Sequence, residues 1–258
     1  MRPLGPNARN RWRADAGSAD LVRPDRSARP ARIAAAPKRL RLDLARTAFV
    51  AVDLQNDFCH PDGWLAGIGV DVSAAGPAIA ATAALLAPLR AAGVPVVWVT
   101  WGVRPDLANV PPGVMHVYDG AAEGRGLGAP SGPRAAPVLA AGSWSAELVA
   151  GLEIAPEDLR IDKHRMSGFW DTPLDSALRN LRVDTLLFAG VNADQCVLHT
   201  LADAACLGYD VVMVEDACAT TSPAFCMEAT LYNVRQIFGF TATSDAVLAG
   251  LAEAEGAA

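Results

Sequence analysis

Residues 185–208 read TLLFAGVNADQCVLHTLADAACLG, and their first seven residues form an apolar run that predicts a buried strand. A polar turn follows over residues 192–195, and a helical pattern of apolar residues then continues to Gly208. This order places Cys196 in the first turn of a helix, just beyond the carboxyl end of a central strand. Because helix N-termini stabilise anions, we expect its thiol to be shifted toward the reactive thiolate. On position alone, a role as a small buried hydrophobic residue is an equal alternative.

The same alternation of apolar run and helical pattern extends over most of the chain. Besides the strand at 185–191, the pattern predicts strands at 48–53, 95–100, 158–162, 209–215 and 240–243, with helices between most of them. Strands that alternate with helices favour right-handed crossovers and a parallel sheet. The predicted fold is therefore α/β, with three layers: a mostly parallel six-stranded sheet and helices on both of its faces.

The N-terminal residues differ in composition from the rest of the chain. Residues 1–46 contain 11 Arg and one Lys against four Asp, a net charge of +8, so the remainder carries −14 of the overall −6. Residues 1–45 are rich in Arg, Pro and Ala and show no sustained apolar period. We expect a basic arm over 1–45 that is disordered or lies over the surface, followed by a single folded domain over 46–258.

Composition excludes several classes of function. The longest apolar runs fall short of the roughly 18 residues of a membrane span, so we expect no membrane partner. An acidic body is a poor ligand for nucleic acid, so we expect no nucleic-acid partner either. Five cysteines without a CxxC pair or a secretory signal indicate reduced thiols and a cytoplasmic location.

Two further polar residues follow predicted strands in the way that Cys196 does. Asp53 comes after the run at 48–52, and Lys163 comes after the run at 158–162. The carboxyl ends of parallel strands share one edge of a sheet, so Asp53, Lys163 and Cys196 can meet in one crevice. There Asp53 could take the thiol proton, and Lys163 could favour the thiolate for attack on a carbonyl carbon. An ion pair beside a buried cysteine is the structural alternative.

The motifs around these residues resemble those of the isochorismatase-like cysteine hydrolases over roughly residues 47–251. The matching segments are VDLQNDF at 52–58, the Lys163 segment, and GVNADQCV at 190–197 with Thr200. The resemblance implies a catalytic triad of Asp53, Lys163 and Cys196. It also implies an oxyanion hole made by the backbone N–H groups of Asn192 and Cys196, with a cis peptide bond between residues 191 and 192. The family commonly carries Ala or Thr where this chain has Asn192.

Within that family, the motifs are most similar to those of the ureidoacrylate amidohydrolases of pyrimidine degradation. The shared features are GSW at 142–144, KxRxSGF at 163–169 and TPLDS at 172–176. Met166 stands where those enzymes tend to carry Tyr. The resemblance implies no cofactor, and it implies no metal because His116 is isolated where metal-binding nicotinamidases carry an Asp/His cluster. Isochorismatases proper lack the nucleophilic cysteine, so Cys196 argues against their vinyl-ether chemistry. Family members usually assemble as homo-oligomers, so we expect a dimer or tetramer.

Five residues near the three strand ends are candidates for contact with the substrate: Gln55, Phe58, Trp101, Arg165 and Ser167. Aromatic walls with a few polar groups are typical of small-molecule pockets. Arg165 could bind a substrate carboxylate through a two-pronged contact, although a surface salt bridge is the commoner role of such an arginine. The Gly- and Pro-rich segment at 101–137 is long enough to be a lid, a binding loop or a partner contact.

We therefore expect a cysteine-dependent amidohydrolase whose partner is a small amide or ureido substrate. It would cleave a C–N bond of a ureido, carbamoyl or carboxamide compound through a thioester, releasing ammonia or an amine. The alternative from another class is a non-catalytic member of the same fold that binds a metabolite or a partner. A transferase that passes the acyl group to an acceptor other than water would use the same three residues.

Overall fold

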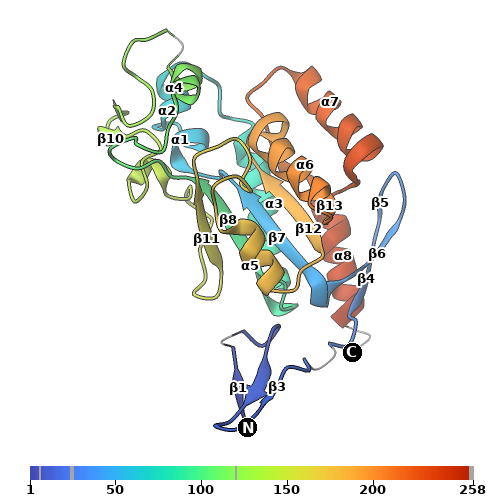
Figure 1. The fold of residues 1–258 in the computed structure, drawn as a ribbon. Coiled ribbons are helices and arrows are strands. Elements are labelled where there is room, and N and C mark those ends of the chain that lie inside the picture. Colours follow the sequence, from blue (N-terminus) through green and yellow to red (C-terminus); the bar gives the residue numbers. More distant parts are fainter. Residues whose placement is uncertain (6, 24–25, 120, 256–258) are drawn as a thin grey trace.

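The computed structural model describes residues 1–5, 7–23, 26–119 and 121–255 of the chain. A seven-stranded sheet runs through its centre (Figure 1), with the spatial order β11 (Leu159–Lys163), β8 (Val96–Trp101), β7 (Thr47–Val52), β12 (Thr185–Gly190), β13 (Asp210–Cys218), β14 (Phe240–Ala242) and β5 (Ala35–Ala36). The first six strands pair in parallel and correspond to the six predicted runs, whereas β5 pairs antiparallel with β14. The predicted α/β class is confirmed.

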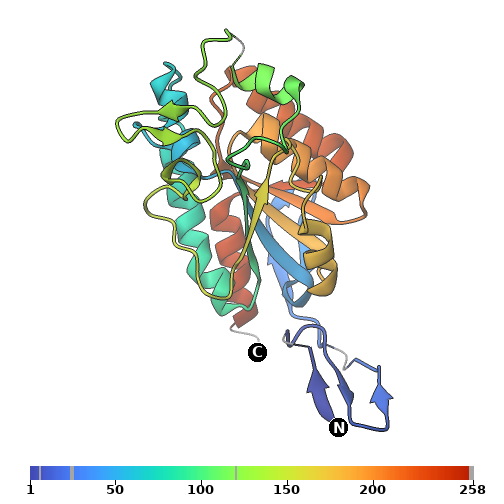
Figure 2. The same ribbon diagram turned by 60° about the vertical axis from the view of Figure 1, so that its left-hand side comes forward.

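Helices cover both faces of this sheet (Figures 1 and 2), which makes the three predicted layers. One face carries α3 (Ala75–Ala91) and α8 (Ser244–Glu255), and the other carries α5 (Leu174–Asn180), α6 (Leu198–Cys206) and α7 (Ala224–Asn233). A π-helical turn, η4 (Val234–Phe238), continues α7. Every residue of β7, β8 and β12 is buried, as expected for central strands that are covered on both faces.

The carboxyl end of the sheet is covered by short elements from two segments (Figure 1). The segment after β7 supplies α1 (Asn56–Cys59) and α2 (Trp64–Gly67). The segment after β8 supplies α4 (Pro112–Tyr118), β9 (Pro130–Ser131), β10 (Ala136–Pro137) and the 3-10 turn η2 (Trp144–Ala146). The long segment thus has structure of its own and lies over the edge where the predicted catalytic residues are expected. No helix in the described ranges is long and apolar enough to cross a membrane.

The N-terminal arm carries short strands at the opposite end of the sheet (Figure 2). A small antiparallel sheet is formed by β1 (Arg2–Leu4), β2 (Trp12–Ala14) and β3 (Ala19–Asp20). A second pair, β4 (Pro30–Ile33) and β6 (Leu40–Asp43), lies against α8 and leads through η1 (Leu44–Arg46) into β7. Ala31, Ile33 and Leu42 belong to the hydrophobic core. Residues 30–43 therefore pack with the domain, ahead of the boundary at residue 46 that the sequence suggests.

Three arginines of the arm bind backbone carbonyls at the C-terminal ends of two helices. Arg9 donates to the oxygens of Gly93 at 2.8 Å and Leu181 at 3.2 Å, and Arg29 donates to the oxygen of Ala92 at 2.6 Å. Arg26 donates to the oxygen of Arg182 at 2.9 Å. The last carbonyls of a helix lack partners within it and attract cations, so the positive charge of the arm has a structural use.

Candidate active site

The three predicted catalytic residues lie at the carboxyl ends of three strands. Asp53 follows β7, Lys163 is the last residue of β11, and Cys196 lies in a π-helical turn, η3 (Ala193–Val197), that joins β12 to α6. Because β8 separates β11 from β7, the Lys163 side chain extends across the end of β8 toward Asp53. Asp53 and Lys163 are fully buried, and Cys196 is 4% exposed. Parallel strand order thus brings together three residues that are distant in the sequence.

The Lys163 ammonium contacts both other members of the trio. Its Nζ lies 2.8 Å from Oδ2 of Asp53 and 3.4 Å from Sγ of Cys196. It also donates to the backbone oxygen of Arg165 at 3.2 Å. Beyond the ion pair, neither carboxylate oxygen of Asp53 accepts a well-aligned hydrogen bond within the described ranges. The carboxylate is therefore held by charge, with an oxygen able to accept a proton.

The backbone around the trio has two unusual conformations. Asp53 has a φ of 53°, a left-handed conformation that costs a non-glycine residue on the order of 1–3 kcal/mol and clusters at functional sites. Gly190, the last residue of β12, has a φ of 130°, and a Cβ there would lie 2.0 Å from the backbone oxygen of Val52. Only glycine fits this close approach, which draws the ends of β7 and β12 together beneath the site.

Burial sets the protonation state of the resting site. It raises the pKa of the Cys196 thiol to about 12, although Lys163 opposes the rise. Burial also raises the pKa of Asp53, and Lys163 again opposes it. Burial of the thiol thus works against the shift toward thiolate that we expected for Cys196 from its place at a helix start. Burial therefore favours the neutral thiol of Cys196 and makes Asp53 a better proton acceptor.

The predicted oxyanion-hole residues lie in the turn that precedes α6. The peptide bond between Val191 and Asn192 is cis, as the resemblance implied. Asn192 uses its side-chain oxygen to accept from the N–H of Thr221 at 3.1 Å, and its backbone oxygen accepts from Gln195 at 3.0 Å. No hydrogen bond within the described ranges uses the Asn192 backbone N–H. This donor is thus available to a ligand, as the predicted oxyanion hole requires.

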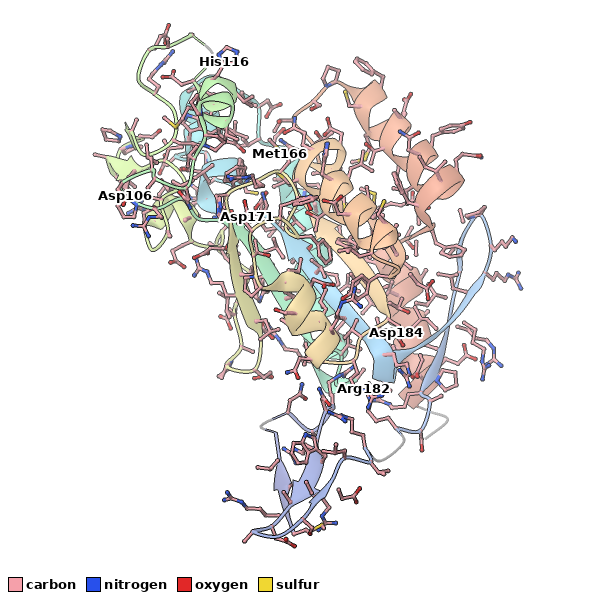
Figure 3. The ribbon with its side chains drawn as sticks, in the orientation of Figure 1. Asp106, His116, Met166, Asp171, Arg182 and Asp184 are labelled. Atoms are coloured by element: carbon pink, nitrogen blue, oxygen red, sulfur yellow. The ribbon has the colours of Figure 1, made fainter. Side chains whose placement is uncertain are left out.

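Two further residues contact the Cys196 turn. The hydroxyl of Thr200 donates to the backbone oxygen of Cys196 at 2.6 Å and accepts from the N–H of Gly168 at 3.0 Å, which ties the turn to the segment after β11. The Met166 thioether lies 3.6 Å from Cys196 Sγ. Met166 is partly exposed above the end of β11, next to α6 (Figure 3). The sequence did not predict that Met166 contacts the thiol. It showed only that Met stands at this position where the ureidoacrylate amidohydrolases tend to carry Tyr.

The side chain of Gln55 is hydrogen-bonded to the backbone of Trp101, and neither residue lies at the mouth of a pocket. The Gln55 side chain accepts from the Trp101 N–H at 2.7 Å and donates to the Trp101 and Ala146 oxygens, each at 2.8 Å. Both side chains are fully buried, and Phe58 is 7% exposed within the core. Gln55 has no N–H left for a substrate, and its position supports a role in fixing the end of β8.

Arg165 and Ser167 line an open depression of about 390 Å³ beside the trio, together with Met166, Trp170, Asp171, His199 and Asp203. Arg165 donates to the backbone oxygen of Asn109 at 2.9 Å and pairs with Asp171 at 3.1 Å. Met166 lines the depression and also contacts Cys196, so its side chain separates the depression from the thiol, and none of the trio lines the depression itself. A larger cavity of about 590 Å³ lies at the far end of the sheet, under the arm, and none of the trio lines it.

Sequence reasoning missed two residues that build the wall of the site. Asp57 is buried and accepts from the N–H groups of Trp64 at 3.1 Å and Leu139 at 2.9 Å, which joins the two segments that cover the sheet edge. Tyr118 packs on Trp64 and Trp101 at ring-centroid distances of 5.4 and 5.0 Å. The only signal in the sequence was the place of Asp57 in the VDLQNDF motif at 52–58.

A metal site is not evident in the part of the chain that the structure describes. No group of three or more His, Cys, Asp or Glu side chains there is arranged to hold an ion. His116 lies on α4, at the outer end of the molecule (Figure 3).

Fold and site together define a three-layer α/β protein with a buried Asp–Lys–Cys trio at the carboxyl edge of its sheet. The isochorismatase domain model matches residues 47–246. Ureidoacrylate amidohydrolase RutB from Methylobacterium radiotolerans is 37% identical over 207 residues, which cover 80% of each chain.

Two solved structures are similar as well. A cysteine hydrolase from Pseudomonas syringae pv. phaseolicola is 26% identical, with a TM-score of 0.71 over 83% of this chain and 95% of its own. N-carbamoylsarcosine amidase from Thermoplasma acidophilum is 27% identical, with a TM-score of 0.58 over 78% of this chain and 97% of its own. The chain belongs to the isochorismatase family and is a hydrolase, and the predicted family resemblance is confirmed.

Proposed function

We propose that this protein is a cysteine amidohydrolase that cleaves a C–N bond of a small ureido, carbamoyl or carboxamide substrate. The observation that carries the proposal is the buried contact of Lys163 with both Asp53 and Cys196, at 2.8 and 3.4 Å. The similar ureidoacrylate amidohydrolase and N-carbamoylsarcosine amidase bear names that fit this class of bond.

In the first half-reaction, Asp53 accepts the thiol proton and the sulfur of Cys196 attacks the carbonyl carbon. The backbone N–H groups of Asn192 and Cys196 stabilise the oxyanion that forms. Protonated Asp53 then gives its proton to the leaving nitrogen, and ammonia or an amine departs from a thioester. The raised pKa of Asp53 suits this exchange, because burial brings an acid closer to the pH at which it can take and return a proton.

In the second half-reaction, Asp53 takes a proton from water, and the hydroxide attacks the thioester. The Lys163 ammonium lies beside the sulfur, which leaves as thiolate and takes back a proton from Asp53. An acceptor other than water would give a transferase with the same residues, so the products must be identified chemically.

The depression beside Met166 is lined by Arg165 and by two aspartates, of which Asp171 pairs with Arg165 at 3.1 Å. Arg165 is the cationic side chain of its lining that lies closest in sequence to Lys163, and Ser167 lies beside it. We propose that Arg165 contacts a carboxylate of the substrate, while Ser167 contacts its carbonyl group. A ureido or carbamoyl acid has both groups.

We also propose that the protein is a homo-oligomer, a dimer or tetramer, and acts in the cytoplasm. Three apolar side chains on α7 and η4 are strongly exposed: Phe225 at 67%, Tyr232 at 64% and Ile237 at 69%. All five cysteines are free, as a reducing compartment would require. Light scattering that finds only a monomer would contradict the assembly.

Ammonia release from a panel of ureido acids, N-carbamoyl amino acids, biuret and aryl carboxamides tests the function. The matched control is Cys206→Ala, which changes the exposed cysteine at the end of α6. We expect the unaltered protein and Cys206→Ala to be active on part of the panel, and Cys196→Ala to lose about 10³-fold or more. Full activity in Cys196→Ala would overturn the mechanism. No turnover of any compound, with a Cys196 that iodoacetamide does not label, would favour the non-catalytic binding role.

A further inference from the structure

Trp101 is fixed in place through both its backbone and its ring. It is the last residue of β8 and pairs in register with Lys163 on β11. Gln55 binds its backbone on both sides, at 2.7 and 2.8 Å, and its ring packs edge-on against Tyr118. The indole is fully buried, so its orientation is fixed relative to the catalytic trio.

One face of this indole lies against the Lys163 ammonium. The Nζ atom is 4.2 Å from the ring centroid. The same Nζ is 3.4 Å from Cys196 Sγ and 2.8 Å from Asp53 Oδ2. The electron-rich face of an indole attracts a cation, so Trp101 helps to hold the Lys163 ammonium in place after Asp53 has become neutral.

The edge of the same indole carries a buried donor without a partner. The Nε1–H of Trp101 makes no well-aligned hydrogen bond in the described ranges. A buried tryptophan N–H normally finds an acceptor, and leaving one without an acceptor is unfavourable. The missing acceptor is thus expected to appear during the reaction, when a negative charge forms nearby.

We propose that Trp101 is a further catalytic residue whose indole N–H donates to the sulfur of Cys196 once the thiol has lost its proton. In this step the S–H bond breaks, the proton moves to Asp53, and the electron pair stays on sulfur, where it accepts from Trp101. The proposal rests on the proposed role of Cys196 as nucleophile. A donor that is satisfied only by the thiolate favours the activated state over the resting state.

The electrostatics of the site support this role. Burial raises the pKa of Cys196, and among the groups that oppose this rise are Lys163 and the Trp101 side chain. Trp98, on the same strand, differs in this respect. Its Nε1 already donates to Asp158 at 2.9 Å, and it is equally buried.

The test compares Trp101→Phe, which keeps an aromatic face and removes the N–H, with Trp98→Phe as a matched control. The readout is the rate of iodoacetamide alkylation at the Cys196 peptide over a range of pH, followed by mass spectrometry. This assay needs no substrate, so failure of the proposed amidase activity leaves it readable. If loss of the donor raises the thiol pKa by about one unit, the thiolate fraction falls about tenfold at a given pH. The remaining thiolate is about threefold more nucleophilic, so the net rate falls about three- to fourfold.

We expect that decrease in Trp101→Phe and an unchanged rate in Trp98→Phe. A folded Trp101→Phe that is alkylated at the unaltered rate at every pH would overturn the proposal. If Trp101→Phe does not fold, placing β-(3-benzothienyl)alanine at position 101 keeps the shape of the indole and replaces only the N–H by sulfur. An unchanged rate in that protein would overturn the proposal equally, and a three- to fourfold slower rate would support it.

Discussion

Replacing Lys163 by methionine removes the ammonium that lies 2.8 Å from Asp53 and leaves a buried carboxylate without its counter-charge. Removing one partner of a buried ion pair costs about 3–5 kcal/mol in unfolding free energy, because the other charge stays buried. Lys163→Met is therefore expected to be much less stable than the unaltered protein. The size of the loss depends on pH, since a buried carboxylate can escape the cost by binding a proton.

The sign of this pH dependence follows from the pKa of Asp53. Burial already raises that pKa, and Lys163 is the largest influence that opposes the rise, so its removal raises the pKa further. The folded variant then keeps a proton that the unfolded chain releases above about pH 3.9. Its unfolding free energy falls by about 1.4 kcal/mol for each pH unit above that value, until the pH passes the folded-state pKa. In the unaltered protein, Asp53 makes the unfolding free energy fall with rising pH as well, but less steeply, because Lys163 opposes the rise in its pKa.

Urea unfolding followed by circular dichroism, at mildly acidic and mildly alkaline pH, measures both effects. The control is the double variant Asp53→Asn with Lys163→Met, which has no charge at either position. We expect the double variant to be more stable than Lys163→Met at alkaline pH and to lack the added pH dependence. A Lys163→Met protein with the pH dependence of the unaltered protein would refute the reasoning. A double variant that is less stable than the single one at alkaline pH would refute it as well.

Three other changes have defined outcomes. Gly190→Ala places a Cβ 2.0 Å from the Val52 oxygen at a residue with a left-handed backbone conformation. We expect the unfolding free energy to fall by more than about 4 kcal/mol and little soluble protein to form, and an unchanged melting temperature would contradict this. Thr200→Val removes the 2.6 Å hydrogen bond to the Cys196 oxygen, and we expect a loss of about 1–2 kcal/mol in chemical unfolding, with a lower kcat. Met166→Ala uncovers Sγ of Cys196, which Met166 contacts at 3.6 Å, so iodoacetamide should label Cys196 faster than in the unaltered protein; an equal rate would show that Met166 does not shield the thiol.

The central strands β7, β8 and β12 could be predicted because each is a short apolar run that is buried at every position. The edge strand β11 has a weaker signal, because its exposed Arg160 and Asp162 alternate with buried Ile161 and Lys163. Such runs depend on local sequence, and the α/β class that they indicated is confirmed, as is the family that the motifs at 52–58 and 190–197 resemble. β5 could not be predicted in this way, because its two alanines form a strand only by pairing with β14, which is distant in the sequence. The packing of Ile33 in the core depends likewise on a long-range contact, with β4 lying against α8.

The meeting of Asp53, Lys163 and Cys196 follows from strand order, and the sequence therefore predicted it. The protonation state does not follow from strand order. A local argument from the helix start favoured the thiolate, whereas the surrounding atoms bury Cys196 and raise its pKa. The role of Gln55 could not be predicted for the same reason. Its place in a motif does not reveal that its side-chain amide is already hydrogen-bonded to the backbone of Trp101. The catalytic and substrate-binding roles of these residues stay predictions until they are measured.

Mass spectrometry of the acid-quenched protein during turnover tests the central claim most directly. With a substrate from the ammonia-release panel, we predict a transient mass increase that equals the acyl group and maps to the Cys196 peptide. The adduct should be absent in Cys196→Ala and present in Cys206→Ala. Steady ammonia release without an adduct on Cys196, or with an adduct on another residue, would contradict a thioester mechanism at this site.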